Sequence, residues 1–319
     1  MTKKVYIPQA VAREGVDFLL ERGYGIVRGD SPDPETFRRE AADCDGVLLR
    51  TTPCPGEALA AAKHLRIVAR HGVGCDNIDV AAAERLGIWV TNTPQALSDS
   101  VAEFTLAAML AAAKKIPQCS AALYAGDYFY KNAHKGMDLS GRTLGIVGFG
   151  RIGRALAKKA RWGLDMEVLA YSRSLRQEQA PDYVTACGLE ELLGRADIVT
   201  LHIPGGGANR NLFDASRFAQ MKDGAVLVNV ARGEVVDEGA LVQALEGGKL
   251  SFAVLDVQRT EPIETDSPLL GRRDILLTPH MASNTEECMA RMALHAAQQI
   301  HKVLSGQTPD WPVNHPVRK

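Results

Sequence analysis

Three ionisable residues in the second half of this 319-residue chain each follow an apolar run of the kind that forms a buried strand: Arg232, Glu261 and His280. A guanidinium offers a planar fork of donors that suits a carboxylate. A histidine exchanges protons near neutral pH, and a carboxylate beside it favours its charged form. Together the three predict acid–base chemistry on a small substrate that carries a carboxylate.

Each of these residues also has a simpler interpretation. Arg232 could form a salt bridge on the rim of the fold, and most single histidines are structural. Asp256 and Glu261 stand five positions apart and could bind a metal, cap a helix or orient a base. No compact His/Asp/Glu cluster accompanies them, so no metal is expected. The occurrence of Arg, Glu and His at three separate strand ends favours one shared site.

The glycine pattern Gly148-Phe149-Gly150-Arg151-Ile152-Gly153 directly follows the apolar run Thr143 to Val147 and opens into a helical pattern. Gly148 can make a tight turn, Gly150 lets a pyrophosphate approach the backbone, and Gly153 lets the helix lie close to its strand. The N-terminus of that helix offers free N–H groups to phosphates. A turn required only for packing would not account for all three glycines. The pattern therefore predicts a dinucleotide site that includes Arg151 and Ile152.

Short β-type runs alternate with helical patterns both before residue 92 and after the glycine turn. This rhythm predicts parallel sheets covered by helices. We expect an α/β fold of two doubly wound domains with a cleft between them. The final helical pattern, from Asn284 to Leu304, is expected to return to the first domain. The predicted domains are residues 1–97 with 285–319, and residues 98–284.

The end of the second strand in the nucleotide domain bears on which coenzyme is used. An NAD-binding protein usually has Asp or Glu there, about 20 residues after the glycines, where it binds the ribose hydroxyls. In this chain the strand Glu167 to Tyr171 is followed by Ser172, Arg173 and Ser174, with no acid. These side chains suit a 2′-phosphate, although Arg173 could instead cover the adenine or lie in solvent. The sequence predicts NADPH as the preferred coenzyme, with NADH as the alternative.

Composition limits the classes of partner. The net charge of −1 gives no electrostatic footprint for nucleic acid or an anionic membrane. Six cysteines without a CxxC pair are typical of reduced thiols, and the N-terminus lacks the apolar core of a signal peptide, so a cytoplasmic location is expected. Leu123 to Gly136 has several aromatic residues without a clear period. We expect an irregular surface segment there that packs on a second subunit.

Several motifs occur in one order along the chain: ARHGVGCDNIDV, GFGRIG, NVARGEVVD, LDV followed by EP, TPH, and a closing GQTPDWPVN. In this combination the chain resembles the D-isomer-specific 2-hydroxyacid dehydrogenase family over essentially its whole length. The resemblance implies a split, flavodoxin-like substrate domain, a central Rossmann cofactor domain and a homodimer formed through the cofactor domains. It also implies hydride transfer between NAD(P)H and a 2-keto or D-2-hydroxy acid.

The resemblance assigns roles to particular residues. Arg232 is expected to bind the substrate carboxylate and carbonyl, His280 to transfer the proton, and Glu261 to pair with His280. Val73 and Gly74 are expected to donate backbone hydrogen bonds to the substrate carboxylate. The remaining residues expected at the cofactor are His202, Pro204, Val230 and Asp256, the last beside the nicotinamide.

Two departures and one ambiguity accompany the resemblance. The family usually has His-x-Pro-Leu-Thr where this chain has three glycines after Pro204, which predicts a more flexible loop near the cofactor. A phenylalanine that commonly follows Asp-Val is Gln258. Arg50 and Arg70 are similar to arginines that bind phosphate in phosphoglycerate dehydrogenases, but they could equally be surface residues. We expect a glyoxylate- or hydroxypyruvate-type reductase, with a 3-phosphoglycerate dehydrogenase or a non-enzymatic dinucleotide sensor as alternatives.

Overall fold

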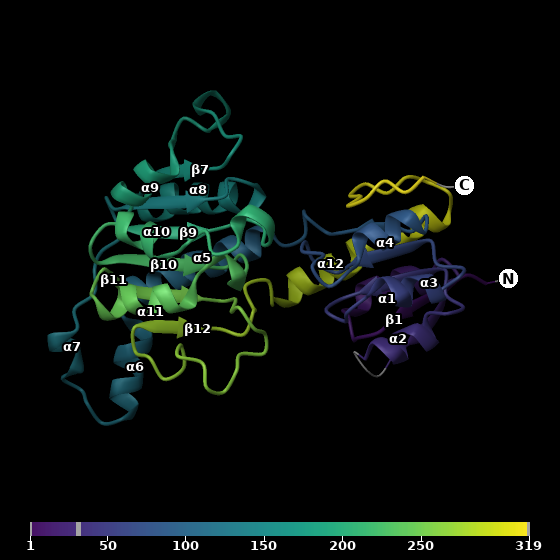
Figure 1. Ribbon diagram of the computed structural model, residues 1–319, viewed down its shortest axis with the longest axis horizontal. Coiled ribbons are helices and arrows are strands. Elements are labelled where there is room, and N and C mark those ends of the chain that lie inside the picture. Colours follow the sequence, from purple (N-terminus) through teal and green to yellow (C-terminus); the bar gives the residue numbers. More distant parts are fainter. Residues whose placement is uncertain (1, 30–32, 318–319) are drawn as a thin grey trace. The chain divides into compact units, whose positions relative to one another are not determined.

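The computed structural model describes residues 2–29 and 33–317, and the chain divides into two α/β domains (Figure 1). Domain 1 comprises Met1–Leu97 and Ser283–Lys319, and domain 2 comprises Ser98–Ala282. The chain therefore returns to domain 1 at residue 283, two residues before the predicted boundary at residue 285. Shortly after this boundary, the Thr285 side chain accepts a hydrogen bond from the Cys288 N–H and caps a helix that lies in domain 1.

Domain 1 is built on a five-stranded parallel sheet with the strand order β2-β1-β3-β4-β5. This is the flavodoxin-like order, so the predicted fold class of the domain is confirmed. Apart from Arg70 at the end of β4, the residues of β3 and β4 are buried and not charged, as expected for central strands of a sheet with helices on both faces. The strands are β1 (Lys4–Ile7), β2 (Gly25–Arg28), β3 (Gly46–Leu49), β4 (Ile67–Arg70) and β5 (Trp89–Thr91).

Two groups of helices cover the sheet of domain 1. On one face, α1 packs against the long C-terminal helix α12, so closely that a Cβ on Gly15 would lie 2.5 Å from the Ala293 carbonyl oxygen. The other three helices share a second core with the opposite face. The helices are α1 (Arg13–Leu20), α2 (Pro34–Glu40), α3 (Gly56–Ala61), α4 (Val80–Arg85) and α12 (Glu286–Leu304).

Domain 2 contains a seven-stranded parallel sheet with the order β12-β11-β10-β9-β6-β7-β8. Counted within the domain, this is the Rossmann order with one additional strand, and the strand order reverses between β6 and β9. Ligands of such sheets bind outside the carboxyl ends of the strands at this point. The strands are β6 (Thr143–Val147), β7 (Glu167–Tyr171), β8 (Val184–Ala186), β9 (Ile198–Leu201), β10 (Ala225–Asn229), β11 (Leu250–Leu255) and β12 (Ile275–Leu277).

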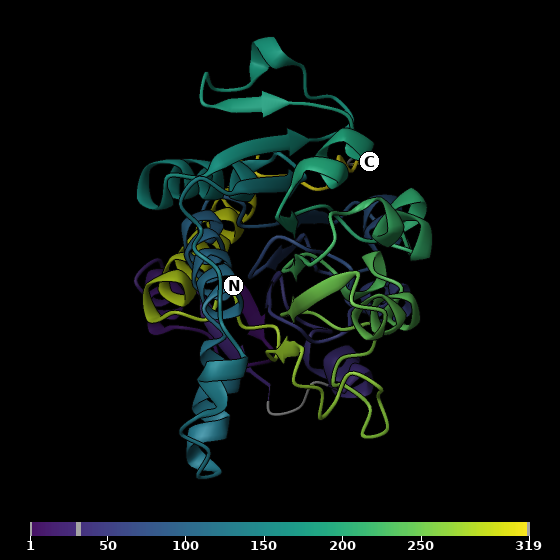
Figure 2. The ribbon, with the colours of Figure 1, turned by 90° about the vertical axis from the view of Figure 1, so that its left-hand side faces the viewer.

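Helices cover both faces of this sheet as well (Figure 2). The helices α5 (Ser98–Ala113) and α8 (Arg151–Leu164) pack together on one face. The opposite face carries α9 (Leu189–Arg195), α10 (Ala215–Gln220) and α11 (Glu238–Glu246). Single 3₁₀ turns occur at Gln177–Gln179, Gly207–Asn209 and Gly233–Val235.

Two parts of domain 2 were not anticipated from the sequence. The short edge strand β8 has only three residues and carries no clear pattern. No helix was expected directly after α5, but α6 (Ile116–Tyr124) forms there; the segment Leu123 to Gly136, expected to be irregular, contains the end of α6 and the single turn α7 (Tyr130–Ala133), and both helices extend away from the sheet in both views (Figures 1 and 2). Pro117 is the second residue of α6, a position that is possible because proline is well accommodated in the first turn of a helix.

Candidate active site

The turn after β6 has the local geometry that the glycine pattern predicts. Gly148 has φ of 103°, and a Cβ there would lie 2.3 Å from the carbonyl oxygen of His202. A Cβ on Gly153 would lie 2.4 Å from the Gly148 carbonyl oxygen, so the helix can approach its strand only without a side chain at this position. Gly150 is the N-cap of α8 and has open space around it. A phosphate can therefore approach the free N–H groups of the helix.

His202 lies across the strand-order reversal from this turn, at the end of β9. Both ring nitrogens are buried and form no hydrogen bond with any described residue. Burial lowers the pKa of His202 to about 3, so the ring is neutral. Buried polar atoms are rarely left without a partner. Together with the open space at Gly150, these nitrogens are compatible with a dinucleotide bound at this edge of the sheet.

The residues after β7 form an exposed polar turn. Ser172 is half-buried, whereas Arg173 and Ser174 are exposed. Among the described residues, the side chains of these three form no hydrogen bond or ion pair. The neighbouring Arg154, on α8, lies over the Phe149 ring and donates to the Gln179 carbonyl oxygen. The turn therefore exposes the guanidinium of Arg173, which no described acidic residue neutralises, near the helix that begins at the glycine turn.

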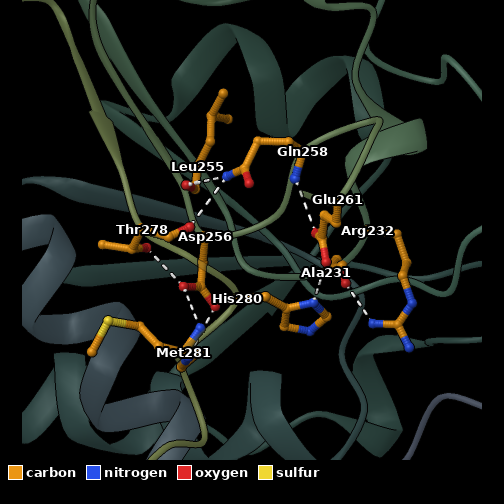
Figure 3. A network of polar contacts seen from close by, with 10 residues as sticks. Ala231, Arg232, Leu255, Asp256, Gln258, Glu261, Thr278, His280 and Met281 are labelled. Carbon is orange, nitrogen blue, oxygen red and sulfur yellow. Dashed lines mark hydrogen bonds and ion pairs between the residues drawn. The ribbon is translucent and has the colours of Figure 1, made fainter. Parts of the chain in front are cut away.

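The predicted proton-transfer pair is formed within domain 2 (Figure 3). His280 Nδ1 lies 2.8 Å from Glu261 Oε2, although the two residues are 19 positions apart. A carboxylate at this distance accepts a hydrogen bond from Nδ1–H and thereby fixes the tautomer. The other ring nitrogen, Nε2, has no partner among the described residues, and the side chain is 51% exposed. His280 can therefore present Nε2 to a ligand.

The charges around Glu261 keep it ionised. Burial raises the pKa of this carboxyl, but the hydrogen bond and charge of His280 lower it, as do the Gln258 N–H and the Arg232 charge, and the net pKa is below its usual value. The Gln258 N–H donates to Glu261 Oε1 at 3.1 Å. A carboxylate that stays charged can stabilise an imidazolium beside it.

Arg232 stands between β10 and a 3₁₀ turn. The Asn229 side chain shapes this segment, because its amide donates to the Arg232 carbonyl oxygen at 2.9 Å and its oxygen accepts the Ala231 N–H at 3.0 Å. The guanidinium donates to the Ala231 carbonyl oxygen at 2.6 Å. The side chain is partly exposed at the same edge of the sheet as His280 (Figure 3). The role of the fully buried Asn229 was not anticipated from the sequence.

The loops that carry Arg232 and Glu261 are packed backbone to backbone. A Cβ on Gly233 would lie 2.0 Å from the carbonyl carbon and oxygen of Gln258. No rotamer change can relieve a clash with backbone atoms, so this position requires glycine. The glycine in the ARGE motif thus fixes the separation between the two loops, which the motif alone did not reveal.

Asp256 holds the loop that bears His280. Its carboxylate is fully buried and accepts hydrogen bonds from the Thr278 hydroxyl at 2.7 Å, the Met281 N–H at 2.8 Å and the Ala282 N–H at 2.9 Å. Its carbonyl oxygen accepts the His280 N–H at 2.7 Å. These contacts support the left-handed backbone of His280, which has φ of 50°. Asp256 was expected to lie beside the nicotinamide. In the structure its carboxylate accepts hydrogen bonds from three groups of the protein.

The loop of three glycines after Pro204, expected to be flexible, is attached to the protein at one point. The Gly206 N–H donates to Glu234 Oε1 at 2.7 Å, and a Cβ on Gly205 would lie 2.3 Å from the same oxygen. The loop is thus tied to the segment that carries Arg232. Pro204 itself is exposed and Val230 is half-buried, both at the carboxyl ends of their strands.

The predicted substrate residues of domain 1 also come together. Arg50 follows β3 and Arg70 ends β4, and these strands are neighbours. His71, directly after Arg70, has a pKa lowered to about 4, first by burial and then by the charges of Arg70 and Arg50. The Arg70 guanidinium donates to the His71 carbonyl oxygen and lies against Gly72. Both arginines therefore belong to one positively charged strand edge.

The loop after β4 offers free backbone donors. Among the described residues, the N–H groups of Val73 and Gly74 donate to no acceptor. The loop is held in place by Thr93, whose hydroxyl accepts the Gly72 N–H at 3.0 Å, and by Asn92, whose amide donates to the Val73 carbonyl oxygen at 3.0 Å. Two adjacent unpaired N–H groups can bind one anion such as a carboxylate.

Within residues 2–29 and 33–317, no cluster of three or more His, Cys, Asp or Glu side chains could hold a metal ion. In the same part of the chain, no helix has the length and hydropathy needed to cross a membrane.

The Rossmann strand order and the glycine turn define this chain as a two-domain dinucleotide-binding α/β protein. A family model described as D-isomer specific 2-hydroxyacid dehydrogenase, NAD binding domain, matches residues 106–282. The chain belongs to this family, as its motifs indicated. Its coenzyme is accordingly a nicotinamide dinucleotide.

Individual relatives agree with this assignment. The chain is 37% identical to a glyoxylate reductase of Aeropyrum pernix over 99% of its length and 97% of the relative's. It is 36% identical to a D-3-phosphoglycerate dehydrogenase of Archaeoglobus fulgidus over 98% of its length, and it spans 59% of that protein. A crystal structure of an NADPH-dependent glyoxylate/hydroxypyruvate reductase of Sinorhizobium meliloti, in complex with NADP and malonate, matches with a TM-score of 0.87 and 28% identity, covering 100% of this chain and 99% of that one.

Proposed function

We propose that the protein is an NAD(P)H-dependent reductase of small 2-keto acids that forms D-2-hydroxy acids. The observation that carries this proposal is the 2.8 Å pair of Glu261 Oε2 and His280 Nδ1, at the strand edge that also bears the glycine turn. A dinucleotide sensor would need the turn but not a carboxylate–histidine pair at the same edge of the sheet.

The proposed roles follow from the chemistry of each side chain. Arg232 binds the carboxylate and carbonyl of the keto acid and stabilises the negative charge that develops on the carbonyl oxygen. His280 gives that oxygen its proton from Nε2, and Glu261 stabilises the charged imidazole before the transfer. The bound nicotinamide supplies the hydride. In domain 1, the free N–H groups of Val73 and Gly74 are proposed to bind the substrate carboxylate as well.

The proposed substrate is glyoxylate or hydroxypyruvate, and it is supported by the full-length likeness to a glyoxylate reductase. The alternative, 3-phosphoglycerate and its keto acid, is supported by Arg50 and Arg70, which could bind a phosphate. Oxidation of the reduced coenzyme with glyoxylate, hydroxypyruvate, phosphohydroxypyruvate, pyruvate and phenylpyruvate tests both. A kcat/KM highest for phosphohydroxypyruvate would replace the proposal with its alternative. No turnover with any of them would favour a non-enzymatic sensor.

The proposed coenzyme preference is NADPH over NADH. It is supported by the exposed Arg173, which lies between two serines and has no partner among the described residues, and by the absence of an acid directly after β7. Arg173→Ala should weaken NADPH binding far more than NADH binding, because only NADPH has a 2′-phosphate to pair with the guanidinium. Equilibrium binding of both coenzymes to both proteins measures this difference. A kcat/KM higher with NADH in the unmutated enzyme would contradict the preference.

We also propose that the protein is a homodimer formed through domain 2. The segment of α6 and α7 supports this, because it exposes Leu123, Tyr124, Tyr128 and Phe129, with Tyr124 91% exposed. Clustered exposed apolar side chains on a projecting segment are typical of an interface. Sedimentation analysis of the double variant Tyr124→Glu/Phe129→Glu should give a monomer where the unmutated protein gives a dimer.

A cytoplasmic location remains part of the proposal. All six cysteines have free thiols, including the buried Cys44, Cys54 and Cys288. Unpaired thiols are typical of a reducing compartment. Fractionation of the source cells with an antibody to the protein would measure the location directly.

A further inference from the structure

Gln258 occupies a junction between the loops of the candidate active site. Its side chain is buried, and its amide nitrogen donates to the Leu255 carbonyl oxygen at 3.0 Å and to the Thr278 carbonyl oxygen at 3.2 Å. Leu255 also accepts the Thr278 N–H at 3.1 Å. The amide therefore continues the pairing of β11 with β12 beyond the last residue of each strand, towards His280 (Figure 3).

The backbone of Gln258 contacts the other two loops. Its N–H donates to Glu261 Oε1, while its carbonyl group fills the space that a side chain on Gly233 would need. Gln258 is thus in contact with the segments that carry Arg232, Glu261 and His280. No role for it was apparent from the sequence.

The backbone of His280 needs such support. Its φ of 50° lies in the left-handed region, which is uncommon for residues other than glycine. Its N–H is held by the carbonyl oxygens of Asp256 and Thr278, and the Asp256 carboxylate binds the residues that follow it. The Thr278 carbonyl is in turn held by the Gln258 amide. Gln258 therefore holds the segment before His280, at Thr278, and Asp256 holds the segment after it, at Met281 and Ala282.

We propose that Gln258 is a positioning residue: its amide fixes Thr278 and so sets the orientation of the His280 imidazole against Glu261. This inference deepens the proposed reductase function and rests on it for its kinetic consequences. Without the amide, the segment that bears His280 loses one of its attachments to β11. The imidazole then samples positions away from the carboxylate, and the charged form of the imidazole loses stabilisation.

The test uses Gln258→Met, which keeps the length of the side chain and removes its donors, and Gln258→Asn, which keeps the amide but is too short to reach both carbonyls. Gln299→Met in domain 1 is the matched control, since Gln299 is also buried and its amide is bonded to Asp310. We expect kcat for keto acid reduction to fall about tenfold in both Gln258 variants, as small misplacements of a catalytic group do. Coenzyme affinity should stay unchanged in both variants and in the control.

A second readout does not depend on turnover. NMR titration of the His280 ring, assigned by its loss in His280→Ala, should show that the imidazole deprotonates at lower pH in Gln258→Met than in the unmutated protein. In a Glu261→Gln background the same change should have no effect, because residues that act through one interaction are not additive. An unchanged titration in Gln258→Met, or an equal shift in both backgrounds, would overturn the proposal. If the unmutated protein reduces no 2-keto acid, the proposed function fails while the titration still tests Gln258.

Discussion

Replacing Glu261 with glutamine would change the pH dependence of both reaction directions. The substitution keeps the size of the side chain and an oxygen that can face His280 Nδ1, but it removes the charge from a contact of 2.8 Å. Oxidation of a hydroxy acid needs the neutral imidazole as a base, so its rate falls as the pH decreases and the ring becomes charged. Reduction needs the charged imidazole as an acid, so its rate falls as the pH increases.

The size of the effect follows from the type of hydrogen bond. A hydrogen bond between charged groups contributes about 1.5–3 kcal/mol, and one between neutral groups about 0.5–1.5 kcal/mol. Because the Glu261 side chain is 38% exposed and that of His280 is 51% exposed, solvent screens the pair and the lower end of the difference applies. A loss of about 1 kcal/mol is a roughly fivefold change in an equilibrium constant. Both the acid limb of oxidation and the alkaline limb of reduction should therefore move to lower pH.

The assay is kcat/KM measured as a function of pH in both directions for the unmutated protein and Glu261→Gln. Glu264→Gln is a matched control, because Glu264 lies in the same loop, is exposed and has no described side-chain partner. The control should leave both limbs in place. Limbs that do not move in Glu261→Gln, or that move in opposite directions, would refute the pairing as the source of the pH dependence.

Three other substitutions test the roles of single residues. His280→Ala should lower kcat for reduction by about 10²- to 10⁴-fold, measured by stopped-flow kinetics. It should leave coenzyme binding intact, measured by fluorescence titration. Near-normal turnover would remove His280 from the mechanism. Arg232→Lys should raise KM for the keto acid and lower kcat in steady-state kinetics, because an ammonium cannot reproduce a forked contact. If both constants are retained, that contact is excluded. Asp197→Asn should destabilise domain 2 by about 1–3 kcal/mol at neutral pH, because the carboxylate accepts from Lys222 at 2.6 Å and from the Thr143 N–H at 2.9 Å. Burial raises the pKa of Asp197, but these partners and Arg142 lower it below its usual value, so its stabilisation is present at neutral pH and is lost as the pH falls through that lowered pKa. Denaturant unfolding of both proteins should therefore differ at pH 7 and converge in acid; an equal difference at both pH values would contradict the charge contribution.

Residues that act through their immediate neighbours could be interpreted from the sequence. Gly148 has a positive φ in a tight turn, and Gly153 lies against the Gly148 carbonyl oxygen five positions before it, so the spacing of the glycines was sufficient to predict this local geometry. The strand β7 was predicted with the observed bounds, since an apolar run between turn residues reflects local backbone preference. Because parallel strands end at one edge of a sheet, the sequence also indicated that Arg232 and His280 lie on the same edge.

Tertiary structure decided everything that depends on contacts between distant segments. The hydrogen bond between Glu261 and His280 exists because β11 and β12 are adjacent and the Asp256 carboxylate binds the residues after Thr278. The attachment of the glycine loop to Glu234 joins segments that are 28 positions apart, and no spacing rule covers such a distance. Gln258 was an unexplained residue in the sequence because its partners are carbonyl groups, which every residue has. A sequence pattern records which side chains are present, whereas the direction of a backbone carbonyl is fixed only when the chain is folded.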